Sequence, residues 1–166
     1  MLPLQVVRAN RDEEPILANL LELYAYDFSD LLGLDLGPDG KFGYNKLPLY
    51  WLEPNRHPFL IKFEDKLAGF VLVKRGSEIS GRKDIWDMAE FFVLRRYRRL
   101  RIGSDAAIKI WREFPGLWEI RVLESNPALQ FWKHVISGFT GDYSDVPNIE
   151  KNGKLWRLFA FESQRE

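Results

Sequence analysis

Five arginines lie within one short stretch of a chain whose overall charge is balanced. They are Arg95, Arg96, Arg98, Arg99 and Arg101, while the whole chain holds 24 Lys and Arg against 24 Asp and Glu. A guanidinium forms paired, charge-assisted hydrogen bonds with phosphate oxygens. Positive charge concentrated in this way predicts a site for a phosphate-bearing ligand.

The elements on either side of the arginines suit such a site. A mostly apolar run ends at Val93 and Leu94, and Gly103 and Ser104 open a segment with the apolar spacing of a helix. Its apolar residues are Ala106, Ala107, Ile110, Trp111 and Phe114. A strand, a basic loop and a helix in this order direct the free backbone N–H groups and the positive dipole end of the helix toward the loop. The ligand group that this arrangement predicts is a phosphate.

The spacing within the loop is that of neither a P-loop nor the three-glycine dinucleotide motif. The run Val93-x-x-x-Tyr97-Arg98-Arg99-Leu100-Arg101-Ile102-Gly103-Ser104 instead resembles the acyl-CoA pyrophosphate loop of the GNAT N-acetyltransferase family, whose signature is Arg/Gln-x-x-Gly-x-Gly/Ala. Arg98 and Gly103 match this signature, and Arg101 stands where the first glycine is usual. Since glycine tolerates backbone angles that other residues avoid, Arg101 is expected to serve only with a negative φ.

Two other interpretations of the loop stay open. One is a solvated basic turn, and the other is a nucleic-acid-binding patch with Tyr97 between the arginines. The phosphate loop is favoured over both because a strand precedes it and a helix follows it at suitable distances.

Length and composition favour one ordinary globular domain, residues 1–166. A chain of this size buries ~70% of the surface that it exposes when unfolded. It has no cysteine, which excludes disulfides, thiolate metal sites and a Cys nucleophile. Its first residues lack the charged start and long apolar middle of a signal peptide, and no apolar run approaches membrane-spanning length. We therefore expect a cytoplasmic protein with no membrane association.

The chain alternates predicted strands and helices. Strands are predicted at Leu4–Arg8, Pro58–Phe63, Leu67–Lys74, Ile85–Val93, Leu117–Leu123, Phe139–Tyr143 and Leu155–Phe161. Helices are predicted from an Asp12 cap to Gly33, from Gly103 to Phe114, and from an Asn126 cap to Gly138, with a short helix or lid within Tyr44–His57. The strand after the arginine loop and its helix should run parallel to the strand ending at Val93. Ligands bind at the carboxyl ends of such strands.

The helix that begins near Asn126 carries a second resemblance. GNAT members commonly show Asn-x-x-Ala-x-x-(Leu/Phe)-Tyr-x-x-x-Gly-Phe here, and Ala128, Phe131 and Trp132 fit its middle. Asn126 falls one position late, Gly138 and Phe139 fall two positions late, and Trp132 replaces the Tyr. Together with the order of elements, this implies an α+β (mixed α/β) GNAT-like fold: one domain, with a mixed, mostly antiparallel sheet of about six to seven strands flanked by helices.

The resemblance implies transfer of an acetyl group from acetyl-CoA to an amine by direct attack. The residues that it implies for binding acetyl-CoA are Phe92, Val93, Leu94, Arg98, Arg99, Leu100, Arg101, Ile102, Gly103, Ser104, Asn126, Phe131 and Trp132. The loop would neutralise the pyrophosphate, and the backbone beside Val93 would pair with the pantetheine and supply an oxyanion donor.

Glu90 is the predicted base for the attacking ammonium, whose pKa is about 10. It lies on the strand that the family uses for this purpose, and a carboxylate on the outer face of the sheet is the equally favoured alternative. Asp87 and Glu119 are weaker candidates. Trp132 cannot protonate the leaving thiolate, so Tyr143 or water is predicted to do so.

Several other functions are not favoured by the sequence. His57 and His134 are interpreted as solvated side chains, and no spaced acidic or sulfur partners accompany them, so no metal is expected.

A GNAT relative that binds acyl-CoA or a protein partner without turnover is the second hypothesis, since Arg101 and Trp132 depart from the family pattern. A nucleic-acid partner is not expected, a homodimer stays open, and the acceptor amine is not identified.

Overall fold

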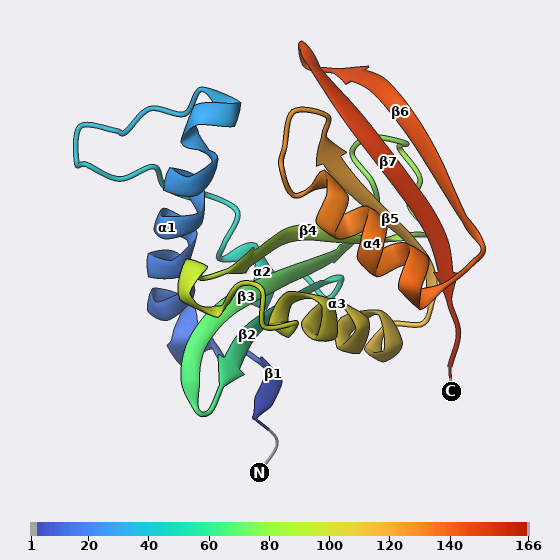
Figure 1. Ribbon diagram of the computed structural model, residues 1–166. Helices are drawn as coiled ribbons and strands as arrows, with labels where there is room; N and C mark the ends of the chain where they lie inside the picture. The colour runs from blue at the N-terminus through green and yellow to red at the C-terminus, as the bar shows by residue number, and fades with distance from the viewer. Residues whose placement is uncertain (1–2, 166) are drawn as a thin grey trace. The chain divides into compact units, whose positions relative to one another are not determined.

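The computed structural model describes residues 3–165 and contains seven strands and four α-helices within them (Figure 1). The strands are β1 (Leu4–Arg8), β2 (Arg56–Phe63), β3 (Lys66–Arg75), β4 (Trp86–Val93), β5 (Gly116–Leu123), β6 (Tyr143–Lys151) and β7 (Lys154–Ser163). The helices are α1 (Glu14–Leu32), α2 (Leu49–Leu52), α3 (Ile102–Glu113) and α4 (Leu129–Phe139), with single 3-10 turns η1 (Arg11–Glu13) and η2 (Arg95–Tyr97).

The strands form one sheet in the order β1-β2-β3-β4-β5-β7-β6. β4 and β5 are parallel, with Trp86 opposite Trp118 and Asp87 opposite Glu119, whereas β1 with β2, β5 with β7 and β6 with β7 are antiparallel. This is the mostly antiparallel α+β architecture that the sequence predicted. The parallel pair that brackets the arginine loop and α3 is likewise confirmed.

The prediction for the segment around Phe139 was wrong. Gly138 was expected to end the last helix and Phe139 to start a strand, but α4 continues through both and β6 begins only at Tyr143. The Phe139 ring lies 5.1 Å from Trp111 and 5.8 Å from Phe161, so this ring extends the buried face of α4 by one more turn. Burial of an aromatic side chain outweighs the weak helix propensity of glycine.

Both predicted helix caps near Asp12 and Asn126 also differ from the structure. Asn10 precedes the η1 turn and donates its backbone N–H to Glu13 Oε1 at 3.0 Å, so Asp12 is not the cap. Asn126 Oδ1 accepts a hydrogen bond from the Ala128 N–H at 2.8 Å, which forms a turn before α4 rather than the cap of α4 itself.

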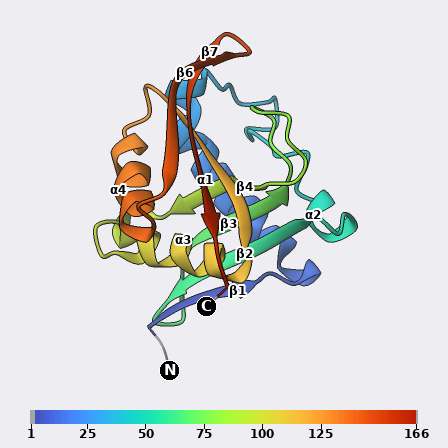
Figure 2. The ribbon, with the colours of Figure 1, turned by 90° about the vertical axis from the view of Figure 1, so that its right-hand side faces the viewer.

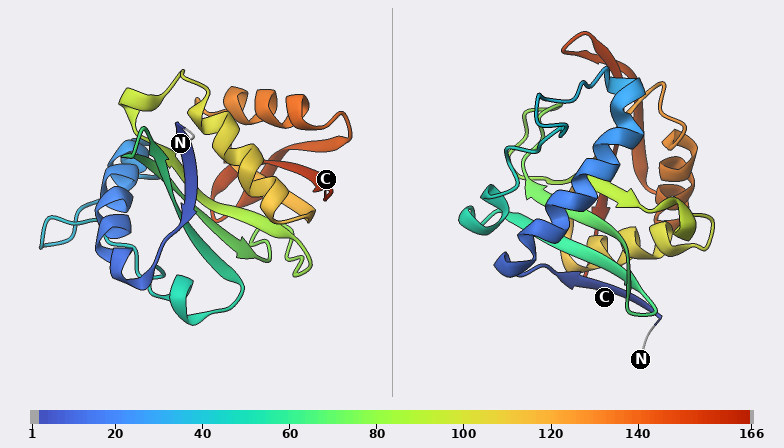
Figure 3. Two further views of the ribbon diagram at one scale, coloured as in Figure 1. Left: turned by 90° about the horizontal axis from the view of Figure 1, so that it is seen from below. Right: turned by 90° about the vertical axis from the view of Figure 1, so that its left-hand side faces the viewer.

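Contacts divide the chain into two compact units. The first comprises residues up to Leu72 together with Glu90–Gly103, and the second comprises Val73–Ala89 together with Ser104 onward. In the first unit, α1 buries Leu17, Leu20 and Leu21 over β2 and β3 (Figure 3, right). Tyr24 of α1 meets Phe70 of β3 edge-on at 5.5 Å, which extends the same apolar layer.

Aromatic side chains dominate the core of the second unit, in which α4 lies along β7 and β6 (Figure 2). Trp111 and Trp118 are fully buried. The Trp111 ring lies 4.8 Å from Phe161 and 6.4 Å from Trp132, so α3, α4 and β7 share one cluster. The many aromatic residues of this chain are therefore used largely for packing.

Gly69 of β3 allows the backbone of β4 to approach closely just before the arginine loop. A Cβ atom at Gly69 would lie 2.0 Å from the Phe92 carbonyl oxygen and 3.1 Å from the Val93 Cα atom. No side chain, however small, fits there without moving the backbone of β4. Gly69 thus fixes the position from which the loop departs, and sequence reasoning did not single it out.

Gly69→Ala is expected to lower the free energy of unfolding by about 1 to 3 kcal/mol or more, because the added methyl overlaps a backbone carbonyl. The matched control is Gly138→Ala, where nothing lies within 4 Å of the added Cβ in an exposed helical position. That change should raise the free energy of unfolding by up to about 1 kcal/mol. Urea denaturation of both variants checks this, and equal midpoints for the two would contradict the close approach.

Candidate functional site

The arginine loop is fixed to the first unit by its two ends. At its start, the Leu94 backbone N–H donates to the Ala68 carbonyl of β3 at 2.8 Å. Within η2, the Tyr97 ring meets Phe63 of β2 edge-on at 6.2 Å. The loop then leads into the first turn of α3, where Ile102 is 3% exposed. The start of the loop is therefore anchored, while Arg95, Arg96 and residues 98–101 are exposed to solvent.

Two residues of the loop have left-handed backbone angles. φ is 64° at Arg99 and 63° at Arg101, whereas Arg98 has φ −76° and Leu100 is not among the residues with positive φ. The expectation of a negative φ at Arg101 was therefore wrong. Arg101 adopts the conformation that glycine adopts without strain, at a cost of about 1 to 2 kcal/mol. Arg98, which precedes Arg99, is extended with ψ 155°, and the two left-handed residues lie two positions apart directly before α3.

Asp27 of α1 holds two of the loop arginines. Arg95 Nη2 donates to Asp27 Oδ1 and Arg98 Nη2 donates to Asp27 Oδ2, both at 2.7 Å, and Arg98 Nε donates to the Val93 carbonyl at 2.8 Å. Burial raises the pKa of Asp27, but the hydrogen bonds from Arg98 and then Arg95 outweigh it, and the net shift of this pKa is downward. Asp27 thus stays ionised, and sequence reasoning gave no sign of it.

These contacts change the role that can be given to the predicted phosphate-binding side chains. Arg98 already bonds Asp27 and Val93, so its first effect is to hold the loop against α1 and the end of β4. Arg99 and Arg101 are exposed side chains, and Gly103 and Ser104 are half-buried in the first turn of α3. The N–H groups of this first turn of α3 are the groups that suit a pyrophosphate.

Glu90, the predicted base, is half-buried in β4 and lies beside Tyr44 from the irregular connection between α1 and α2. The Tyr44 hydroxyl donates to Glu90 Oε1 at 3.4 Å. Burial and then the charge of Glu90 raise the pKa of Tyr44. Two residues further along β4, Phe92 is 6% exposed and its ring lies 5.6 Å from Tyr24. Glu90 is therefore partly shielded from solvent and has a hydroxyl partner from outside its strand, and its role as a base stays a prediction.

The two weaker carboxylate candidates, Asp87 and Glu119, lie in the second unit and are 1% and 4% exposed. They face each other across the parallel strands β4 and β5. The Ser80 hydroxyl lies 2.7 and 3.0 Å from the Glu119 oxygens, and Arg121 Nε lies 3.6 Å from Asp87 Oδ2. Burial raises the pKa of Asp87 above its ordinary value. The network joins β4, β5 and the loop before β4, and catalytic roles for Asp87 and Glu119 stay predictions.

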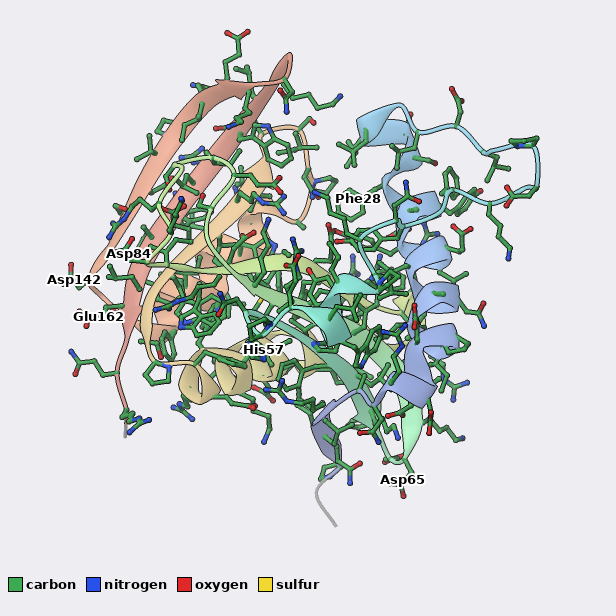
Figure 4. All side chains as sticks on the ribbon, turned by 180° about the vertical axis from the view of Figure 1, so that it is seen from behind. Phe28, His57, Asp65, Asp84, Asp142 and Glu162 are labelled. Atoms are coloured by element: carbon green, nitrogen blue, oxygen red, sulfur yellow. The ribbon has the colours of Figure 1, made fainter. Side chains whose placement is uncertain are left out.

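The remaining predicted site residues lie in the second unit. Trp132 is 8% exposed and packs against Phe131 at 5.0 Å as well as against Trp111, and Asn126 holds the turn before α4. Tyr143 is half-buried where β6 begins and lines a hollow of about 290 Å³. Asp142 and Glu162 belong to the same hollow (Figure 4). The roles of Asn126, Phe131, Trp132 and Tyr143 toward a ligand stay predictions.

Neither histidine belongs to a metal site among residues 3–165. His57 Nδ1 accepts a hydrogen bond from Arg8 Nη1 at 2.7 Å, and burial and then the Arg8 charge lower its pKa, while His134 is exposed. Within the described residues, no group of three or more His, Asp or Glu could hold a metal ion. No helix in this part of the chain is both long and apolar enough to span a membrane.

Comparison with protein families gives a match to the acetyltransferase (GNAT) family over residues 19–135, which is more than half of the chain. The matched segment includes β4, the arginine loop, α3 and most of α4. Comparison with curated proteins gives no match.

Solved acetyltransferase structures share the fold. An acetyltransferase from Thermus thermophilus superposes with a TM-score of 0.69 at 13% identity, covering 97% of each chain. The protein yncA from Salmonella typhimurium, a putative acetyltransferase solved with acetyl-CoA, gives 0.65 at 10% identity over 99% of this chain and 96% of that one. The ribosomal-protein-S18-alanine N-acetyltransferase from Escherichia coli gives 0.63 at 12% identity over 98% and 96%.

The left-handed backbone at Arg101 predicts that glycine is better tolerated there than alanine. Arg101→Gly and Arg101→Ala remove the same guanidinium, but only glycine adopts φ 63° without strain. The free energy of unfolding of the Arg101→Gly variant should therefore be about 1 kcal/mol higher than that of the Arg101→Ala variant, which corresponds to about 2 to 4 °C in Tm. Calorimetric unfolding of the two variants measures this, and an alanine variant as stable as the glycine variant would mean that φ at position 101 is not positive.

Proposed function

Because the chain belongs to the GNAT acetyltransferase family, we propose that it transfers an acetyl group from acetyl-CoA to a primary amine of a small molecule or peptide. The proposal treats residues 1–166 as one acyl-CoA-binding N-acetyltransferase domain. One observation carries it: a strand leads through an arginine loop with two left-handed residues into the N-terminus of the 12-residue helix α3. The free N–H groups and the positive dipole end of a helix N-terminus that follows a strand and a basic loop suit an anion.

In this proposal, the backbone N–H groups from Arg99 to Ser104 bind the CoA pyrophosphate, with the positive end of the α3 dipole behind them. The exposed guanidinium groups of Arg99 and Arg101 add charge. Arg98 supports the site mainly by holding the loop to Asp27 and Val93. The pantetheine lies along the backbone of Phe92–Leu94 as an added strand would. The family resemblance assigns Asn126, Phe131 and Trp132 to the same arm of the cofactor.

The chemical step is a direct acyl transfer between two substrates. Glu90 accepts a proton from the acceptor ammonium, and the resulting neutral amine attacks the thioester carbonyl. The new N–C bond forms first, an N–H group of the β4 backbone stabilises the resulting oxyanion, and the C–S bond then breaks. The CoA thiolate leaves and takes a proton from Tyr143 or from water, and the second proton that the attacking nitrogen loses as the amide forms restores that acid through solvent. No metal takes part in the proposed step.

The second candidate is a GNAT-fold protein that binds acyl-CoA or a protein partner without turnover. It is kept because Trp132 stands where the family has a tyrosine, and the Trp132 side chain is 8% exposed within an aromatic cluster. The acceptor amine is not identified, because similarity to solved structures at such low sequence identity shows the fold alone.

The experiment is a thiol-release assay with acetyl-CoA and a panel of polyamines, aminoglycosides, amino acids and peptides, run on the wild type and on Glu90→Gln. We expect thiol release with at least one class of amine. Loss of a general base is typically worth 10²- to 10⁴-fold, so Glu90→Gln should lower kcat by about that factor at neutral pH. The loss should shrink as pH rises, because the amine then deprotonates without help.

Calorimetric titration with acetyl-CoA is the control, and Glu90→Gln should bind it as the wild type does. Binding of acetyl-CoA with no thiol release on any acceptor would favour the candidate without turnover. An effect of Glu90→Gln below about threefold, or one that is constant with pH, would remove Glu90 from the chemistry and leave catalysis to positioning.

A further inference from the structure

The irregular connection between α1 and α2 is fixed at one end by Glu22. Glu22 Oε2 of α1 accepts hydrogen bonds from the Phe42 N–H at 3.1 Å and the Gly43 N–H at 3.4 Å. The connection loops out from the end of α1 and returns along it (Figure 1). Two successive N–H groups on one carboxylate oxygen fix the direction of the chain directly before Tyr44.

The other end of this segment is fixed by α2. Trp51 Nε1 donates to the Ala9 carbonyl at 3.1 Å, and Leu47 and Tyr50 are 4% and 3% exposed. Tyr44 therefore lies between two anchored points. The residues that form these anchors are distant from Glu90 in the sequence. The Tyr44 ring meets β4 as a consequence of both anchors.

The Tyr44 hydroxyl has the properties of a hydrogen-bond donor that orients the Glu90 carboxylate. Tyr44 stays protonated over the whole working range of pH, because burial and then the Glu90 charge raise its pKa. Its hydroxyl is therefore a donor to Glu90 Oε1 rather than a competing acid. The distance of 3.4 Å is longer than the usual 2.7 to 2.8 Å for such a pair. Catalytic hydrogen bonds are often long in the absence of substrate and shorten in its complex.

The charge of Arg56 also acts on Tyr44, and the Arg56 side chain contacts Glu53 and Tyr50. Arg56 Nε donates to Glu53 Oε2 at 2.7 Å, and its guanidinium lies 5.4 Å from the centre of the Tyr50 ring. Burial raises the pKa of Tyr50 to about 12, with the charge of Glu90 acting in the same direction and Tyr44 and Arg56 acting against it. The charged and titratable groups that interact with Tyr44 include Glu90, Tyr50 and Arg56.

We propose that Tyr44 is a positioning residue for Glu90: its hydroxyl fixes the plane of the carboxyl group by binding Oε1, and Glu22 holds the chain segment that brings it there. This inference rests on the proposed function, in which Glu90 takes the proton of the acceptor ammonium. It adds a partner that orients the base, as a third group orients the base in other acid–base sites. Tyr44 itself neither gains nor loses a proton.

The test is Tyr44→Phe in the thiol-release assay, with the best acceptor of the panel. A hydrogen bond to a charged group corresponds to about 10- to 100-fold in rate, so kcat/KM should fall by that factor while the Kd of acetyl-CoA stays unchanged. Since the hydroxyl favours the ionised carboxylate, the acid limb of the pH profile of kcat/KM should move to higher pH. A merely structural role would leave that limb in place.

Tyr50→Phe is the matched control, because it removes the same atom from the neighbouring ring. The Tyr50 hydroxyl is buried and makes no hydrogen bond of ordinary geometry within the described part of the chain. Its removal should leave both kcat/KM and the pH profile within about twofold of the wild type.

Two further variants keep the inference testable if Tyr44→Phe folds poorly. Glu22→Ala should reproduce the loss and the pH shift, whereas Glu22→Gln, which keeps an oxygen acceptor for Phe42 and Gly43, should restore most of the activity. In the Glu90→Gln background, Tyr44→Phe should cause no further loss, because the two residues act as a unit.

An unchanged acid limb in a folded Tyr44→Phe, or a fully additive loss in the double variant, would overturn the inference. These outcomes differ from failure of the proposed function. If the wild type releases no thiol with any acceptor, both the proposed function and the role of Tyr44 are wrong. If the wild type is active and Tyr44→Phe behaves like it, only the role of Tyr44 is wrong.

Discussion

The crowding of positive charge in one loop is the constraint on which this structure depends. Like charges so close together repel, and the loop would not keep a fixed shape without a counter-charge. Asp27 supplies it from α1 by binding Arg95 and Arg98 together, and Arg98 bonds the last carbonyl of β4 as well. With these two exposed guanidinium groups paired to one carboxylate, the loop keeps its backbone shape, including the left-handed conformations of Arg99 and Arg101 that glycine would adopt without strain.

Elements with strong local signals were predicted well from the sequence. The alternating residues of β5, the left-handed Gly33 that ends α1 and the Asn152–Gly153 turn between β6 and β7 depend on neighbours only a few residues away. The error at Phe139 has the opposite origin. The helix continues there because rings of α3 and β7, distant in sequence, pack against the half-buried Phe139 side chain, and no local pattern reveals these contacts.

The partners of the site residues were the part that sequence could not supply. Asp27 lies 71 residues from Arg98, and Tyr44 lies 46 residues from Glu90, so only the fold brings these pairs together. Arg101 shows a related limit. The rule that left-handed positions favour glycine is a preference of about 1 to 2 kcal/mol, which a well-anchored loop can overcome. Gly69, by contrast, is needed because a backbone carbonyl occupies the space of its missing side chain.

The central claim is that the arginine loop and the N-terminus of α3 bind the CoA pyrophosphate. A crystal structure of the protein with CoA tests this most directly. We expect pyrophosphate oxygens within about 3.2 Å of backbone N–H groups between Arg99 and Ser104, with Arg98 still bound to Asp27. CoA bound with its pyrophosphate away from these N–H groups, or a loop that loses its left-handed residues on binding, would contradict this binding site.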